Sequence, residues 1–152
     1  MSNMKNQIKS LLISLAVLAT LSIILTGCDN SSGPTTTDLS EGSGYRIRMS
    51  ISEDTLPSGG STIVTAAIFD ETGQPAADAD DSVAFAFSDK GGDWSGLSDG
   101  KADLKGGVAL ATLKWDDPSS GETVEPSRTA WISAAYRGAV AKIQVRLVSV
   151  SF

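Results

Sequence analysis

Apolar and polar residues alternate with a period of two over most of the chain after residue 44. This is the period of half-buried β-strands, whereas an amphipathic helix would repeat every three to four residues. The alternation is clearest at 139–147, where alanine, isoleucine, valine and leucine face one way and Lys142, Gln144 and Arg146 face the other. The pattern predicts strands at 45–51, 62–69, 83–87, 107–115, 128–136 and 139–147, with a weaker one near 97–104.

Turn-forming residues separate these strands. The segments 57–60 and 70–75 are rich in glycine, proline and aspartate, and Gly91-Gly92 is a further turn signal. Strands that recur every ~10–20 residues between such turns are typical of a β-sandwich. The sequence therefore predicts an all-β sandwich of about seven strands over residues 45–152. In 107–115 both sides of the strand are apolar, so alternation does not decide which side is buried.

The N-terminal region has a different pattern. Lys5 and Lys9 precede an uncharged run at 11–25, which is shorter than the ~20 residues that a membrane-spanning helix needs. A basic start, a short apolar run and then small residues are typical of a removable secretory signal. The residues that close this run resemble the lipobox of bacterial lipoproteins, and they are Leu25, Thr26, Gly27 and Cys28.

This resemblance implies that a diacylglycerol is attached to the sulfur of Cys28, that a peptidase cuts before Cys28, and that the new amine is acylated. Residues 1–27 are then a signal peptide, and the mature protein is held by lipid on the extracytoplasmic side of a bacterial membrane. Each buried CH₂ of an acyl chain contributes about 0.8 kcal/mol to such anchoring. The alternatives are a plain signal peptide or a short membrane helix that ends in a cysteine.

Residues 28–44 are predicted to be the acylated cysteine and a flexible linker. Leu39 is the one strong hydrophobe between residues 29 and 44, and such a composition buries too little surface to offset the entropy of ordering. Asp29, directly after the cysteine, is a candidate sorting residue, because lipoproteins of enteric bacteria with aspartate there tend to stay in the inner membrane. The alternative is an ordinary linker residue, and which membrane holds the protein stays open.

Composition excludes several functions. Removal of residues 1–27 takes away Lys5 and Lys9 and leaves 10 basic and 18 acidic side chains, a net charge of −8, which disfavours nucleic acid as a partner. Histidine is absent and the single cysteine is committed to lipid. The usual general base, the nucleophile systems built on histidine and the normal zinc ligand sets are therefore missing. We expect no enzymatic activity, no catalytic residues, no metal site and no cofactor.

Two acidic groups are the candidates for other chemistry. Asp78, Asp80 and Asp81 could supply calcium ligands, although the spacing of a calcium loop is missing, and a solvated turn is the favoured interpretation. The loop 116–125 contains several carboxylates that could in principle catalyse glycoside hydrolysis, but solvation or a charged rim is favoured. These carboxylates belong to Asp116, Asp117, Glu122 and Glu125.

The tryptophans are the candidates for recognition. Trp131 lies opposite Ala130 and Ile132 in the alternation, so its side chain is expected to point away from the core. Exposed tryptophans are favoured at protein interfaces, and they stack on sugar rings. We therefore single out Trp94 and Trp131 as candidate recognition residues. The alternative is that these side chains serve packing, with Trp131 covered by the acidic loop 116–125.

Several of the predicted strands resemble bacterial immunoglobulin-like domains of the invasin/intimin (Big) type. The resemblance is found at 64–75, which ends in Asp-x-x-Gly-x-Pro, at 83–87, at 103–113 and at 130–134. It implies an Ig-like sandwich and a role in the cell envelope. We expect a lipid-anchored module with a structural or protein-interaction function. The alternatives are a carbohydrate-binding or adhesin module that uses the tryptophans, and an accessory subunit of an envelope complex.

Overall fold

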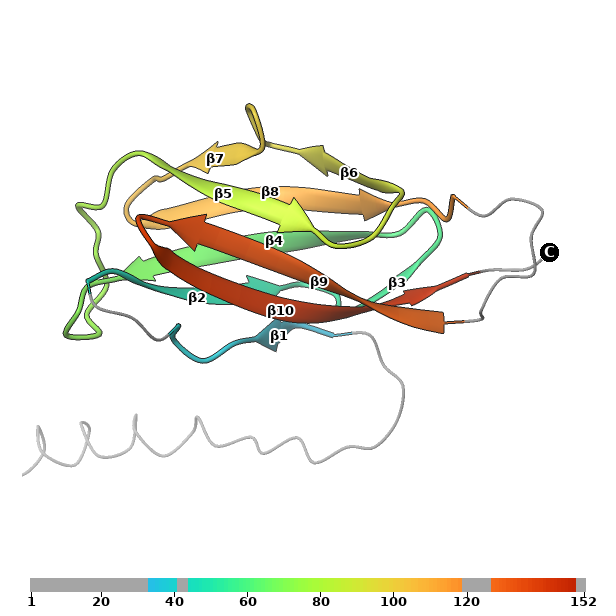
Figure 1. Ribbon diagram of the computed structural model, residues 1–152, viewed down its shortest axis with the longest axis horizontal. Helices are drawn as coiled ribbons and strands as arrows, with labels where there is room; N and C mark the ends of the chain where they lie inside the picture. Colours follow the sequence, from blue (N-terminus) through green and yellow to red (C-terminus); the bar gives the residue numbers. More distant parts are fainter. Residues whose placement is uncertain (1–32, 41–43, 119–126, 150–152) are drawn as a thin grey trace, which may run out of the picture. The chain divides into compact units, whose positions relative to one another are not determined.

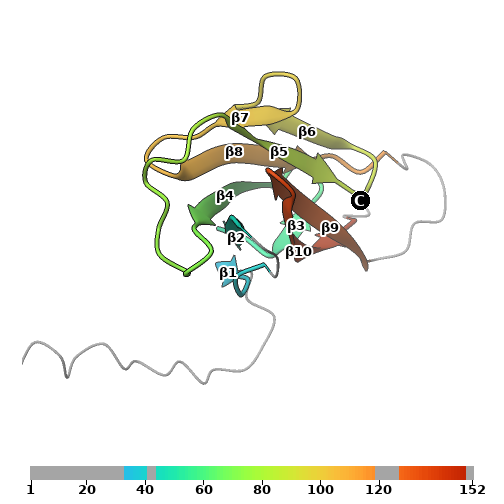
Figure 2. The ribbon, with the colours of Figure 1, turned by 60° about the vertical axis from the view of Figure 1, so that its left-hand side comes forward.

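The computed structural model of the protein describes residues 33–40, 44–118 and 127–149, which belong to one compact unit spanning Ser32–Phe152. In this part of the chain all regular structure is β, and the strands form two sheets packed face to face (Figures 1 and 2). No helix within these described residues is long and apolar enough to cross a membrane. The predicted all-β sandwich is confirmed.

The two sheets have five strands each. The first has the order β1-β2-β4-β8-β6 and the second the order β3-β10-β9-β5-β7. Neighbouring strands are antiparallel except β3 and β10, which are parallel. The strands are β1 Thr35–Thr36, β2 Arg46–Ile51, β3 Thr55–Pro57, β4 Ser61–Phe69, β5 Ser82–Phe87, β6 Gly92–Ser95, β7 Lys101–Asp103, β8 Val108–Trp115, β9 Ser127–Tyr136 and β10 Ala139–Val148.

The six clearest predicted strands correspond to β2, β4, β5, β8, β9 and β10, and the weaker one near 97–104 contains β7. Three short strands were not predicted: β1, β3 and β6. β3 ends inside a predicted turn and pairs with the end of β10, and β6 directly follows the Gly91-Gly92 turn signal. Strands of two to four residues are too short to display a period.

The core lies between the sheets and is built by the alternation that the sequence shows. On β10, the side chains from Ala139 to Leu147 that were predicted to share a face are all buried. On β8, where the alternation left both sides open, Ala109, Ala111 and Leu113 are buried and Leu110 is 57% exposed. Ala109 and Ala111 lie opposite Ala66 and Val64 of β4, so small side chains line the inner face where these two central strands meet.

The ordered unit begins before the predicted boundary at Tyr45. Residues 35–40, here called the N-terminal strap, follow the edge of β2 through backbone hydrogen bonds. The N–H of Thr37 donates to the carbonyl of Met49 and the N–H of Ser40 to that of Ile47, each at 2.9 Å. In return, the N–H groups of Met49 and Ile47 donate to the hydroxyls of Thr37 and Ser40.

The prediction of a flexible linker is therefore wrong for the strap. The prediction was based on the small number of hydrophobic residues. An edge strand can instead be held by hydrogen bonds from its backbone groups and hydroxyls to the backbone of the neighbouring strand.

Candidate functional site

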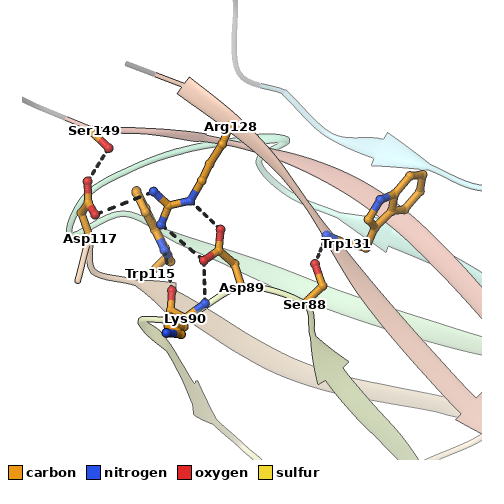
Figure 3. A network of polar contacts seen from close by, with 8 residues as sticks. All are labelled: Ser88, Asp89, Lys90, Trp115, Asp117, Arg128, Trp131 and Ser149. Carbon is orange, nitrogen blue, oxygen red and sulfur yellow. Dashed lines mark hydrogen bonds and ion pairs between the residues drawn. The ribbon is translucent and has the colours of Figure 1, made fainter. Parts of the chain in front are cut away.

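Trp131 lies on β9 and points out of the second sheet, as predicted, with 47% of its surface exposed. Its backbone is held on both sides. Ser88 accepts a hydrogen bond from the N–H of Trp131 at 2.8 Å, and the N–H of Ser88 donates to the Trp131 carbonyl at 3.0 Å (Figure 3). Gln144 of β10 is directly opposite Trp131 on the other side. The indole is thus carried by a fully paired central strand.

The side chains beside Trp131 along β9 and toward β5 are small. Ser133 and Ala135 follow it on the outer side of β9, and Ala86 and Ala84 lie opposite them on β5. Side chains of this size leave the sheet surface flat on the β5 side of the indole. We call the outer side of β5, β9 and β10 the β9 face. Its members are Ala84, Ala86, Ser88, Thr129, Trp131, Ser133, Ala135, Val140, Lys142, Gln144 and Arg146.

The β9 face contains two cations and no carboxylate, although the chain has 18 acidic and 12 basic residues. Lys142 and Arg146 flank Gln144 on β10, diagonal to Trp131 in the strand register. Among the described residues, neither cation forms an ion pair, and Arg146 donates one long hydrogen bond, of 3.5 Å, to the hydroxyl of Ser127.

A shallow hollow of about 340 Å³ continues the β9 face beyond Ala135. Its floor includes Ala84, Ala135 and Val140, which form one row across the three strands. Lys101, Arg137 and Asp81 lie around it. The hollow is therefore polar at its rim and apolar at its floor.

Trp94, the other candidate recognition residue, does not share this face. On β6 it lies opposite the buried Leu113, and its ring packs on Phe85 of the second sheet with 5.8 Å between ring centroids. Trp94 is half-buried against the core. The side chain of Trp131 therefore lies on an outer surface, whereas that of Trp94 points into the space between the sheets.

The third tryptophan, Trp115, is fully buried, and a network of polar contacts surrounds it (Figure 3). Its Nε1 donates to the carbonyl of Lys90 at 3.0 Å, and the Arg128 guanidinium lies over its ring at 5.2 Å from the centroid. Arg128 also donates to the carboxylate of Asp89, and lies 3.9 Å from that of Asp117. This network joins β8 to the start of β9.

The acidic loop begins with carboxylates that already have partners. Asp116 is bound to Lys114 at 2.8 Å, and Asp117 accepts a hydrogen bond from the hydroxyl of Ser149 in addition to its contact with Arg128. Glu122 and Glu125 lie outside the described residues. The part of the loop that is described therefore acts as a packing element.

Of the three aspartates before β5, Asp80 is engaged in an ion pair, with Arg137. Its backbone carbonyl accepts a hydrogen bond from the hydroxyl of Tyr136 at 2.8 Å. Burial raises the pKa of Tyr136 above its ordinary value. Asp78 and Asp81 are exposed. Among the described residues, no group of three or more histidine, cysteine, aspartate or glutamate side chains is arranged to hold a metal ion.

The anchor residues Leu25, Thr26, Gly27 and Cys28, and the candidate sorting residue Asp29, lie outside the described residues. The sequence argument did not identify Ser88 or the small side chains around Trp131 as parts of a site. The alanines that alternate with valine and phenylalanine at 83–87 were a usable signal, since they show that the outward positions of that strand are small.

Comparison with known proteins supports the fold and goes no further. No family model matches the sequence, and no curated protein matches it. Among solved structures, the chain is similar to part of a β-glucuronidase from glycoside hydrolase family 2, with 14% identity and a TM-score of 0.50 over 83% of this chain and 15% of that one. It is also similar to part of a glycosyl hydrolase family 2 member from Bacteroides cellulosilyticus, with 13% identity and a TM-score of 0.52 over 79% of this chain and 18% of that one. The chain thus spans less than a fifth of either enzyme, and the likeness is that of one β-sandwich to another.

Proposed function

We propose that the protein is a bacterial lipoprotein, held by acyl chains on Cys28, whose β-sandwich is an extracytoplasmic structural or interaction module of the cell envelope. The basic start, the apolar run at 11–25 and the four lipobox residues support the anchor. The sandwich supports the module, because this architecture offers sheet faces and loop ends as contact surfaces on a rigid body.

The N-terminal strap limits how far the module would stand from its anchor. Because the chain is hydrogen-bonded to β2 from Thr35 onward, seven residue steps separate Cys28 from the sheet. At most ~3.3–3.6 Å per residue, these steps reach about 25 Å. A linker that ran to Tyr45 would reach about 60 Å at the same rise per residue. The module is therefore presented close to the membrane surface.

The proposed role is non-enzymatic. The chain has no histidine to serve as a general base. Asp89, Asp117 and Asp80, which lie in the polar clusters described above, are bound to arginines and stabilise the fold. Presentation of a surface is the function that these features support.

The anchor can be tested in the native host. Cells are fed an alkyne-labelled fatty acid, and the intact mass of the mature protein is measured after detergent extraction. We expect the label and a chain that begins at Cys28, whereas Cys28→Ser should be unlabelled and should leave the membrane fraction. An unmodified chain that still begins at Met1 would contradict the proposal. Comparing the wild type with Asp29→Ser after separation of the membranes tests the sorting role.

A further inference from the structure

We propose that the β9 face binds an acidic polysaccharide, with Trp131 stacking on a sugar ring and Lys142 and Arg146 pairing with the carboxylates of uronic acid units. This inference rests on the proposed function, because it names the ligand that the anchored module would hold. It goes beyond the fold likeness, which assigns no ligand to this chain.

The position of Trp131 supports stacking. The indole is 47% exposed although it lies on the middle strand of β10-β9-β5, and Ser88 holds both backbone groups of the residue. An aromatic side chain on a fixed backbone loses little conformational entropy on binding, and its apolar ring covers the C–H face of a sugar. The small residues Ser133, Ala86 and Ala135 leave room for a flat ring beside it.

Three side chains of β10 near Trp131 can donate hydrogen bonds. Gln144 lies directly opposite, and Lys142 and Arg146 occupy the two diagonal positions, which are ~7–8 Å away in an antiparallel pair. An amide suits sugar hydroxyls, whereas ammonium and guanidinium groups suit carboxylates. A neutral sugar would bind to the Gln144 amide and leave Lys142 and Arg146 without an anionic partner, so an acidic sugar fits this set of groups better.

The distribution of charge selects an anion. The chain is acidic overall, but the β9 face has no carboxylate, and Asp89, next to Ser88 in sequence, is already bound to Arg128. A surface of this kind is complementary to a polyanion while the remainder of the molecule repels it, and this contrast sets the orientation of binding.

The shape of the face selects a polymer. Four residues along β9 separate Trp131 from Ala135, or about 13 Å at ~3.3 Å per residue. The hollow bordered by Lys101, Arg137 and Asp81 lies at that end, and Arg137 is paired there with Asp80. An extended chain can therefore contact the indole and reach the hollow. A protein partner would need about 800 Å² with several apolar anchors, and this face offers Trp131 and Val140.

The test uses the full-length chain in detergent and isothermal titration with polygalacturonate. Fully methyl-esterified polygalacturonate is the matched ligand control, since it keeps the backbone and loses the charge. We expect binding to the acid polymer at low salt, at least tenfold weaker binding to the ester, and weakening by salt because exposed charges are screened. Equal affinity for the acid and the ester would overturn the proposed role of the cations.

Variants identify the surface. Trp131→Ala and the double variant Lys142→Gln/Arg146→Gln should each weaken binding by about tenfold or more, which corresponds to ~1.4 kcal/mol. Leu110→Ala, on the outer side of the first sheet and 57% exposed, and Lys105→Gln are the controls and should bind like the wild type. The double variant alters only exposed side chains, so it remains informative if Trp131→Ala proves unstable.

Three results would overturn the inference. They are undiminished binding by the double variant, binding that falls equally in the Leu110→Ala control, and binding to vesicles of anionic lipid that competes with the polymer. Absence of polymer binding by a chain that is acylated on Cys28 would refute the ligand and leave the anchored module standing. A chain that binds the polymer but lacks acylation would refute the anchored module and leave the proposed ligand standing.

Discussion

Arg128 donates two hydrogen bonds to the carboxylate of Asp89, 39 residues earlier in the chain, from Nε at 2.6 Å and from Nη2 at 3.3 Å. The same guanidinium lies over the ring of the buried Trp115. One cation thus ties the segment after β5 to the start of β9 and covers the largest core side chain. The pair is well shielded, with 27% and 19% of the two side chains exposed.

Removing this cation should destabilise the sandwich. Arg128→Met keeps most of the aliphatic length but leaves Asp89 without its charged partner, and hydrogen bonds to charged groups contribute about 1.5–3 kcal/mol. We expect a loss of that size in the free energy of unfolding, measured by urea denaturation. Lys114→Met is the control, because Lys114 and Asp116 form a solvent-exposed pair, and such pairs contribute little to stability. Equal losses in the two variants would contradict the structural role of Arg128.

Gly91 should not tolerate a side chain. It has φ of +80°, and a Cβ there would lie 2.0 Å from the backbone oxygen of Asp116. Gly100 has a similar φ of +75° but open space around it, so it is a matched control. Both alanine variants incur the cost of a left-handed backbone, about 1–2 kcal/mol. Gly91→Ala should lose a further ~1–3 kcal/mol from overpacking. Indistinguishable unfolding curves would refute this close approach.

The stability of the sandwich should fall in alkali through Tyr136. Its neutral hydroxyl is buried and donates to Asp80, and burial raises the pKa of Tyr136 above the ordinary value of 10.0. The folded state then retains a proton that the unfolded state releases. This contribution is fully present below pH 10 and is lost as the pH rises through the folded pKa.

Comparison with Tyr136→Phe isolates this effect. At pH 7 the variant should be less stable by about 0.5–1.5 kcal/mol, the usual net contribution of one hydrogen bond. The difference should shrink as the pH rises above 10, because the variant has no hydroxyl at this position to ionise. Unfolding measured from pH 7 to 11 checks this, and a difference that stays constant would contradict it.

The N-terminal strap should protect the edge of β2. Thr37→Ala removes the hydroxyl that accepts from the Met49 N–H, and Thr37→Pro also removes the N–H that donates to the Met49 carbonyl. Amide hydrogen exchange at Met49 should therefore quicken in the first variant and further in the second. Asp38→Ala, at an exposed strap position, is the control and should leave this exchange unchanged. Unchanged exchange in Thr37→Pro would show that the strap is not bound in solution.

The strength of the local pattern explains which strands could be predicted from the sequence. On β10, nine consecutive residues alternate between buried and exposed, so the strand and its inner face follow from the residues alone. On β8 both sides are apolar, and the pairing with β4 decides that Leu110 faces out. Short strands such as β6 form by pairing with a strand that is distant in sequence, so the local sequence pattern does not predict them.

The same distinction applies to the candidate site. Trp131 sits inside a strand with clear alternation, so its outward direction was predictable. Trp94 is flanked by aspartate and serine, and its direction is set by Leu113 across the sheet and by Phe85 in the other sheet. The flat surroundings of Trp131 come from β5 as well as β9, so they appear only when the register of the two strands is known.

The way in which the strap is attached has a mechanical consequence. A pull from the N-terminal side reaches Thr35 first, and the bonds of Thr37 and Ser40 then follow in order along β2. These bonds would be loaded one after another, so we expect the strap to separate from β2 before the longer paired strands of the sandwich do. In the lipid-anchored arrangement proposed above, detachment would add several residues to the segment between the membrane and the sandwich. The length of chain between Cys28 and the sandwich would then depend on whether the strap is paired with β2.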